Sequence, residues 1–146
     1  MRSARSLALA LALVWLPAAC GPGSPGGPSM SGRREEATEL GPDPASNEIM
    51  TRDARTNRAM VKHILVEEDR RLALDLLRRV RAGEPIEPLM AEHSKDEGSA
   101  RSGESYEVTP SAQLVFEFKR LGLRLDVGEA GMVRSQFGWH VMKRIE

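Results

Sequence analysis

The sequence predicts an α+β domain, a small and mainly antiparallel four-stranded sheet surrounded by three to four helices in the order β-α-α-β-α-β-β. Three observations support this prediction. Residues 61–66 form a short aliphatic run with His63 inside it, which is typical of a strand. Residues 72–80 place apolar side chains at helical spacing, and residues 132–145 contain two short strands joined by a tight turn.

The helices of the first half have recognisable ends. Asp69 is positioned to cap a helix whose apolar stripe includes Leu72, Leu76 and Val80, and Gly83 is positioned to end it. A second helix follows Pro85. Its expected inner face consists of Ile86, Leu89, Met90 and His93. The polar stretch after it, residues 94–104, is expected to be a loop with room for one helical turn.

The second half begins with a short strand, indicated by Tyr106 and Val108. Pro110 and Ser111 are expected to start a third helix. That helix would present Leu114, Phe118 and Leu121 to the core. Gly128 is expected to turn the chain before the two closing strands.

The N-terminus reads as an export signal. Arg2 and Arg5 precede an apolar run from Leu7 to Leu16, which is well short of the roughly 20 residues that a spanning helix needs. Small residues then precede Cys20, the only cysteine of the chain. We therefore expect residues 1–19 to be a signal peptide and Cys20 to carry lipid. The alternative is an ordinary signal peptide followed by a chance cysteine.

The segment after Cys20 lacks the pattern of a folded domain. Residues 21–47 are rich in Gly, Pro and Ser and have no apolar period, whereas residues 48–59 could form a loose helical turn. The predicted organisation is a signal peptide, a lipidated tether over residues 20–59 and a folded domain over residues 60–146. The expected location is the cell envelope, with the periplasmic face of the outer membrane as the favoured membrane surface.

The charge balance limits the choice of partners. Without residues 1–19, 19 basic groups face 21 acidic ones, because that segment holds two arginines and no acid. A net charge near −2 argues against nucleic acid. We expect a monomer that meets the membrane through its lipid.

Five motifs follow one another through the predicted domain. They are KHILV at residues 62–66, MAEHSKD at 90–96, a P-x-x-Q-L-x-x-x-F pattern at 110–118, VGE at 127–129 and SQFGWHV at 135–141. In this order and spacing the chain resembles the parvulin-type (rotamase or PpiC-like) peptidyl-prolyl cis-trans isomerases. Residues 103–107 read GESYE where most family members have a GGxLG segment, so Tyr106 stands where an apolar wall of the proline pocket would be.

The resemblance implies a fold, a reaction and a set of site residues. His63 would lie beside His140, linked to it by a hydrogen bond and held by the Ser135 hydroxyl. Asp96 would face the substrate carbonyl. The residues expected to hold the proline are Leu114, Phe118, Phe137 and Tyr106. The implied partners are proline-containing segments of unfolded, exported proteins, and catalysis without a cofactor or covalent step would favour a twisted X–Pro amide.

Several alternatives remain open from the residues themselves. The histidine pair could simply order the core, Phe118 could be plain core, and Asp96 could be a local helix cap. Metal binding by the three histidines, His63, His93 and His140, is disfavoured because no pair has helical ligand spacing; His93 is interpreted as structural. The whole domain could be a peptide-binding chaperone module with weak or no isomerase activity, or a structural lipoprotein without a client.

Overall fold

A computed structural model describes residues 41–146, so the predicted signal peptide, Cys20 and most of the tether lie outside the described residues. The elements are α1 (Pro44–Thr51), β1 (Ala59–Val66), α2 (Arg70–Arg81), α3 (Ile86–His93), α4 (Glu97–Ser102), β2 (Tyr106–Val108), α5 (Phe116–Gly122), β3 (Ala130–Ser135) and β4 (Gly138–Arg144). None of these helices is long and apolar enough to cross a membrane.

The four strands form one sheet in the order β2-β1-β4-β3, and every neighbouring pair is antiparallel. This confirms the predicted α+β class. The register places Tyr106 opposite Val61 and His140 opposite Leu65. Because alternate residues of a strand share a face, His63 lies diagonally between Tyr106 and His140 on the same face of the sheet.

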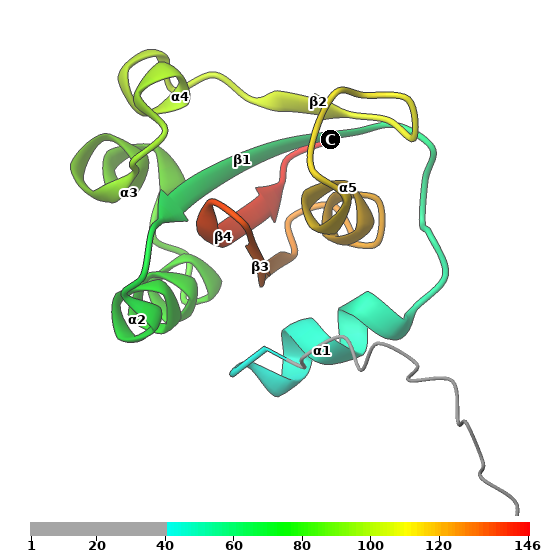
Figure 1. The fold of residues 1–146 in the computed structure, drawn as a ribbon, viewed down its shortest axis with the longest axis horizontal. Helices are drawn as coiled ribbons and strands as arrows, with labels where there is room; N and C mark the ends of the chain where they lie inside the picture. The colour runs from blue at the N-terminus through cyan, green and yellow to red at the C-terminus, as the bar shows by residue number, and fades with distance from the viewer. Residues whose placement is uncertain (1–40) are drawn as a thin grey trace, which may run out of the picture. The chain divides into compact units, whose positions relative to one another are not determined.

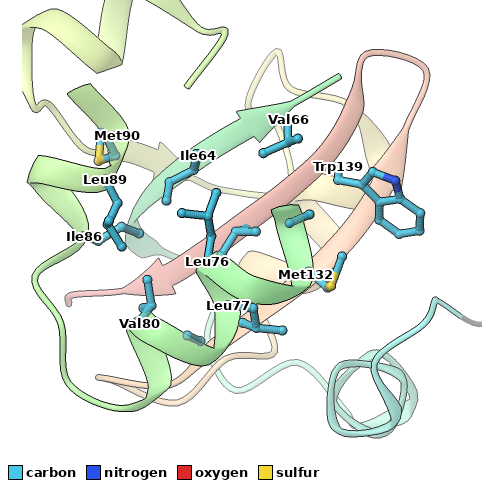
Figure 2. Packing of buried hydrophobic residues seen from close by; sticks show 13 residues of the cluster. Ile64, Val66, Leu76, Leu77, Val80, Ile86, Leu89, Met90, Met132 and Trp139 are labelled. Carbon is cyan, nitrogen blue, oxygen red and sulfur yellow. The ribbon is translucent and has the colours of Figure 1, made fainter. Parts of the chain in front are cut away.

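Helices cover both faces of the sheet (Figure 1). α2 and α3 pack on one face, where the side chains of Leu76, Leu89 and Met90 meet Ile64 and Val141 from the central strands. Figure 2 shows the α2 and α3 side chains of this cluster directed at the strands. α5 packs on the opposite face, in a second cluster of buried apolar residues. The histidines belong to that second face.

The first two predicted helices are confirmed. Asp69 Oδ1 accepts a hydrogen bond from the Leu72 N–H at 3.0 Å, which caps α2 as expected. Gly83 follows the helix with a φ of 99°, a conformation that favours glycine. α3 begins directly after Pro85, and a six-residue helix, α4, forms within the polar loop.

The domain begins earlier than the sequence predicted. Residues 44–51, which the sequence places in the predicted tether, form helix α1, and Ile49 is 1% exposed in the core on the α5 side of the sheet. Pro44 occupies the first turn, and Asp43 caps the helix by accepting from the Ser46 N–H at 2.8 Å. The Gly/Pro/Ser-rich composition of the segment favoured a tether, although Asp43 and Pro44 are typical residues for the start of a helix.

The third predicted helix begins later than expected. Residues 110–115 form turns, and α5 starts at Phe116. Leu114 therefore precedes the helix, although it still packs against the second cluster beside Tyr106. The spacing of Leu114, Phe118 and Leu121 suggested one continuous stripe, but a turn can place an apolar residue on the same core without belonging to the helix.

The β3–β4 hairpin turns over two residues, as predicted. Gly138 has a φ of 128°, and a side chain there would meet the backbone of Glu67 and Val66. Only glycine allows this close approach between the hairpin and the end of β1. The hairpin in turn places Ser135 near His140.

Candidate functional site

Four rings from four elements meet on the α5 side of the sheet. His63 comes from β1, Tyr106 from β2, His140 from β4 and Phe118 from α5. Phe118 meets both imidazoles edge-on, with ring centroids 5.1 Å from His63 and 5.3 Å from His140. Tyr106 lies 5.0 Å from His63. The register of the sheet thus gathers residues far apart in the sequence into one cluster, which we call the ring cluster.

The two histidines are neighbours but do not share a hydrogen bond. Their centroids are 5.5 Å apart with the rings inclined at 52°. The Nδ1 atoms of both rings are buried and have no hydrogen-bond partner within residues 41–146. The expected imidazole–imidazole bond is therefore wrong. Diagonal neighbours on a sheet lie farther apart than directly opposite ones, which explains the gap.

The predicted contact between Ser135 and His140 is present. Ser135 Oγ lies 2.7 Å from His140 Nε2 and also accepts a hydrogen bond from the Phe137 N–H at 3.1 Å. A hydroxyl that accepts from a backbone N–H keeps its own proton for donation, so Ser135 can donate to Nε2. The hairpin turn thereby fixes the orientation of the His140 ring.

Asp96 is the polar centre of the site. Its Oδ2 atom accepts a hydrogen bond from the Tyr106 hydroxyl at 2.6 Å and one from the Ser99 hydroxyl at 2.9 Å. His63 Nε2 faces the same oxygen at 3.4 Å. Burial alone would raise the pKa of Asp96, but the donors Tyr106 and Ser99, together with His63, hold that pKa below its ordinary value. Asp96 is therefore an ionised carboxylate at neutral pH.

The pKa of Tyr106 is shifted in the opposite direction, above its ordinary value. Burial, followed by the hydrogen bond to the Asp96 carboxylate, raises the pKa of Tyr106 to about 12. Its hydroxyl therefore remains a proton donor throughout the physiological range. Serine at position 99 was not predicted as a site residue, although the spacing Asp96-x-x-Ser99 at the start of a helical turn was visible in the sequence.

Both imidazoles are neutral at neutral pH. Burial lowers the pKa of His63 to about 4, although the Asp96 charge opposes this change. Burial, and next the proximity of His63, lowers the pKa of His140 to about 4 as well. Neither ring is suited to carry a positive charge during turnover. Their arrangement can instead shape the site and supply directed N–H dipoles.

The residues predicted to hold the proline divide into two groups. Phe118 and Tyr106 belong to the ring cluster, and Leu114 packs against the same buried side chains. Phe118 is only 3% exposed, so it is part of the core as well as of the site. Phe137 lies at the hairpin turn and is 55% exposed, without an aromatic contact among residues 41–146.

His93 lies apart from the ring cluster. It is the last residue of α3, and its Nε2 atom is 3.6 Å from the carboxylate of Glu92. No group of three or more His, Cys, Asp or Glu side chains suited to a metal ion occurs in the described part of the chain.

Comparison with known proteins decides the family. The model of the PPIC-type PPIASE domain matches residues 46–146. The chain belongs to the parvulin-type, PPIC-type peptidyl-prolyl isomerase family. The match begins inside α1, which agrees with the earlier start of the folded domain.

Relatives within this parvulin family are chaperones and isomerases by name. Chaperone SurA of Chromohalobacter salexigens is 37% identical over 92 residues, which are 57% of this chain and 21% of the relative. A probable parvulin-type peptidyl-prolyl cis-trans isomerase of Bordetella pertussis is 37% identical over 86 residues, 57% of this chain and 33% of that one. The chain thus spans only a fifth to a third of these curated relatives.

A small solved parvulin matches almost completely. The solution structure of NmPin, the parvulin of Nitrosopumilus maritimus, is 31% identical with a TM-score of 0.55. The alignment covers 62% of this chain and 98% of NmPin. About three fifths of the present chain therefore corresponds to nearly all of the solved NmPin chain.

Proposed function

We propose that this protein accelerates cis–trans isomerisation of X–Pro bonds in unfolded segments of exported proteins. The observation that carries the proposal is the ring cluster with Asp96 at its border, in a chain of the parvulin family. Rotation about the bond faces a barrier of about 18–20 kcal/mol, and each tenfold acceleration needs about 1.4 kcal/mol of selective stabilisation. Side chains that favour the twisted amide over both planar forms are sufficient for that purpose.

Each group has a proposed role in this reaction. Phe118, Leu114 and Tyr106 give the pyrrolidine ring an apolar and aromatic surface. The Asp96 carboxylate acts electrostatically on the amide, without proton transfer. The neutral rings of His63 and His140, the latter oriented by Ser135, hold the floor of the site. Phe137, which is exposed at the turn, is available to cover a bound proline.

The alternative is a chaperone module that binds peptides with weak or no isomerisation. Two observations favour it: Phe118 is almost fully buried, and Tyr106 replaces an apolar wall with a hydroxyl engaged by Asp96. A protease-free isomerisation assay with short proline peptides, varied at the residue before proline, separates the two. Binding without acceleration would support the chaperone module.

The decisive variant is Phe118→Ala, with Leu77→Ala as its matched control. Leu77 is 1% exposed on the opposite face of the sheet, in the cluster under α2. Both changes should destabilise the fold by about 2–5 kcal/mol. Only Phe118→Ala should abolish isomerisation per folded molecule. A folded Phe118→Ala protein that isomerises at the wild-type rate would contradict the proposal.

We also propose that the protein works in the cell envelope as a lipid-anchored monomer. The support is the apolar run from Leu7 to Leu16 after Arg2 and Arg5, the small residues before Cys20, and the Gly/Pro/Ser-rich stretch that follows. Metabolic labelling with a fatty acid and membrane fractionation test this. Cys20→Ser should remove the label and release the protein or leave it unprocessed. Labelling and fractionation like those of the wild type would exclude Cys20 as the anchor.

A further inference from the structure

β3 lies at an edge of the sheet, and half of that edge is closed by side chains. The two-residue turn pairs Ser135 with Gly138, so the backbone groups of residues 131, 133 and 135 face β4. Those of residues 130, 132 and 134 point away from the sheet. Ser46 Oγ accepts from the Met132 N–H at 2.8 Å, and Arg81 Nε donates to the Ala130 carbonyl at 3.1 Å. α1 and α2 thus close the first half of the edge.

The second half of the edge is open. Within residues 41–146, the Met132 carbonyl and both the N–H and the carbonyl of Arg134 have no hydrogen-bond partner outside the sheet. Strands usually protect such groups, because they can pair with another extended chain. The N–H and carbonyl of Arg134 can form two hydrogen bonds with one residue of an added strand, and the Met132 carbonyl can accept a third.

A pocket of about 680 Å³ lies along this open half of the edge, and we call it the edge pocket. Residues 132–135 of β3 form one wall. Met50, Phe116 and Trp139 supply apolar surface, and the lining is completed by Gly41, Pro42, Asn47 and charged side chains. Phe116 is 68% exposed and lies beside Trp139 and Met50 in the lining, so it adds to a shared apolar surface. The pocket therefore combines apolar and charged surface with backbone groups that have no partner among residues 41–146.

Charge contributes little to the choice of occupant. Three arginines and two glutamates line the edge pocket: Arg70, Arg120, Arg134, Glu68 and Glu117. Arg120 donates to the Met50 carbonyl at 3.0 Å, and the Arg134 guanidinium lies 5.6 Å from the centre of the Trp139 ring. Two of the cations are thus already engaged with the protein. Backbone pairing and apolar contact are left as the means of recognition.

The edge pocket adjoins the ring cluster at Ser135. Ser135, the last residue of β3, lines the pocket, and its hydroxyl lies 2.7 Å from His140 Nε2 in the ring cluster. An extended chain rises about 3.3 Å per residue, so a polypeptide leaving the proline site needs only a few residues to reach Arg134.

We propose that the open edge of β3 binds an extended, apolar stretch flanking the client's proline as an added strand. Main-chain bonds to Arg134 and to the Met132 carbonyl would give affinity, and the edge pocket would take alternate apolar side chains. The inference rests on the proposed function, since one client would fill both sites. It predicts that long peptides bind more tightly than short ones, and that the charges of their side chains have little effect on this difference.

The test uses the full chain and two peptides. One is a proline tetrapeptide; the other is the same peptide extended by six residues that alternate apolar and polar side chains. The extended peptide should have a KM at least fivefold lower and should slow hydrogen exchange of the Arg134 amide, measured by NMR. N-methylation removes a backbone N–H. Methylation of the residues whose N–H groups face β3 should remove both effects, whereas methylation of the residues between them should remove neither.

Two variants at one position supply the protein-side control. Arg134→Pro deletes the outward N–H without removing a bond to β4, because proline is tolerated on the open side of an edge strand. Arg134→Ala keeps the N–H and removes only the side chain. The ratio of kcat/KM between the long and short peptides should fall to about one in Arg134→Pro and persist in Arg134→Ala.

The outcomes separate this inference from the proposed function. If neither peptide is isomerised but the long one still protects the Arg134 amide, the binding edge stands and the isomerase proposal fails. If the short peptide is isomerised and the extension changes neither KM nor exchange at Arg134, the edge proposal is overturned. Equal effects of N-methylation at both sets of residues would overturn it too, since they would show contact without strand pairing.

Discussion

The hydroxyl of Tyr106 lies 2.6 Å from Oδ2 of Asp96, and this contact joins the shortest strand of the sheet to the turn that begins α4. The same carboxylate oxygen faces His63 at 3.4 Å. Tyr106 thus has two functions at once. Its ring packs in the ring cluster, and its hydroxyl holds Asp96 ionised and oriented toward His63.

Tyr106→Phe isolates the hydroxyl, because the ring and its packing remain. Removal of a donor to a carboxylate should cost about 1.5–3 kcal/mol of unfolding free energy and should raise the pKa of Asp96. As the pH is lowered, the variant should therefore lose isomerase activity at a higher pH than the wild type does. The pH profile of kcat/KM and urea unfolding measure these effects.

Ser99→Ala is the matched control for that variant, since it removes the other hydroxyl donor to the same oxygen. Both variants should move the acidic limb of the profile in the same direction. If Tyr106→Phe leaves this limb unchanged while Ser99→Ala moves it, the Tyr106 hydroxyl does not control the carboxylate.

Stability should depend on pH through the two buried imidazoles. Their pKa of about 4 in the folded protein lies below the value of about 6.5 expected in the unfolded chain. Between these values the unfolded chain binds more protons, so unfolding free energy rises with pH. The contribution of His63 and His140 is fully present above about pH 6.5 and is lost as the pH falls toward 4.

Urea unfolding between pH 4 and pH 7.5 checks this prediction. The wild type should gain a few kcal/mol across the range, as one pKa unit corresponds to about 1.4 kcal/mol. His140→Gln removes one of the two groups and should flatten the slope, even though the variant is less stable overall. An unchanged slope would mean that His140 is not titrating in this window.

α1 is expected to be a structural part of the domain. Ile49 is buried, Ser46 Oγ accepts from the Met132 N–H, and Arg120 donates to the Met50 carbonyl. Ile49→Ala should therefore cost about 2–5 kcal/mol. Glu48→Ala, on the exposed side of the same helix, should change stability by less than about 0.5 kcal/mol. Denaturant unfolding of the two variants gives the comparison, and equal midpoints would show that α1 does not contribute.

The sequence predicted the sheet and the first helices well because their signals are local. Alternation in β1, the Asp69 cap and the Gly138 turn each specify nearby backbone. α1 escaped detection since Ile49 and Met50 supply too few apolar positions in a segment otherwise rich in Gly, Pro and Ser. Its burial depends on β3, far along the chain.

The sequence predicted which residues of the candidate site lie together, but not the hydrogen bonds among them. Motifs identified His63, His140 and Asp96, and the structure brings all three together. Which atoms meet depends on register and rotamers that no motif encodes. The expected bond between the imidazoles is therefore replaced by separate contacts, from His140 to Ser135 and from His63 toward Asp96.

Asp96→Asn tests whether the site works through charge. The amide has the same shape and can still accept from the Tyr106 and Ser99 hydroxyls, so stability should fall by only about 1 kcal/mol, the difference between charged and neutral hydrogen bonds. If the carboxylate acts electrostatically on the twisted amide, kcat should change at least tenfold while KM changes little, because the effect belongs to the transition state. Loss of the charge should also lower the pKa of His63 further, which NMR titration would detect independently of turnover. A wild-type kcat in an Asp96→Asn protein that shows this His63 shift would mean that the carboxylate orders the ring cluster and takes no part in isomerisation.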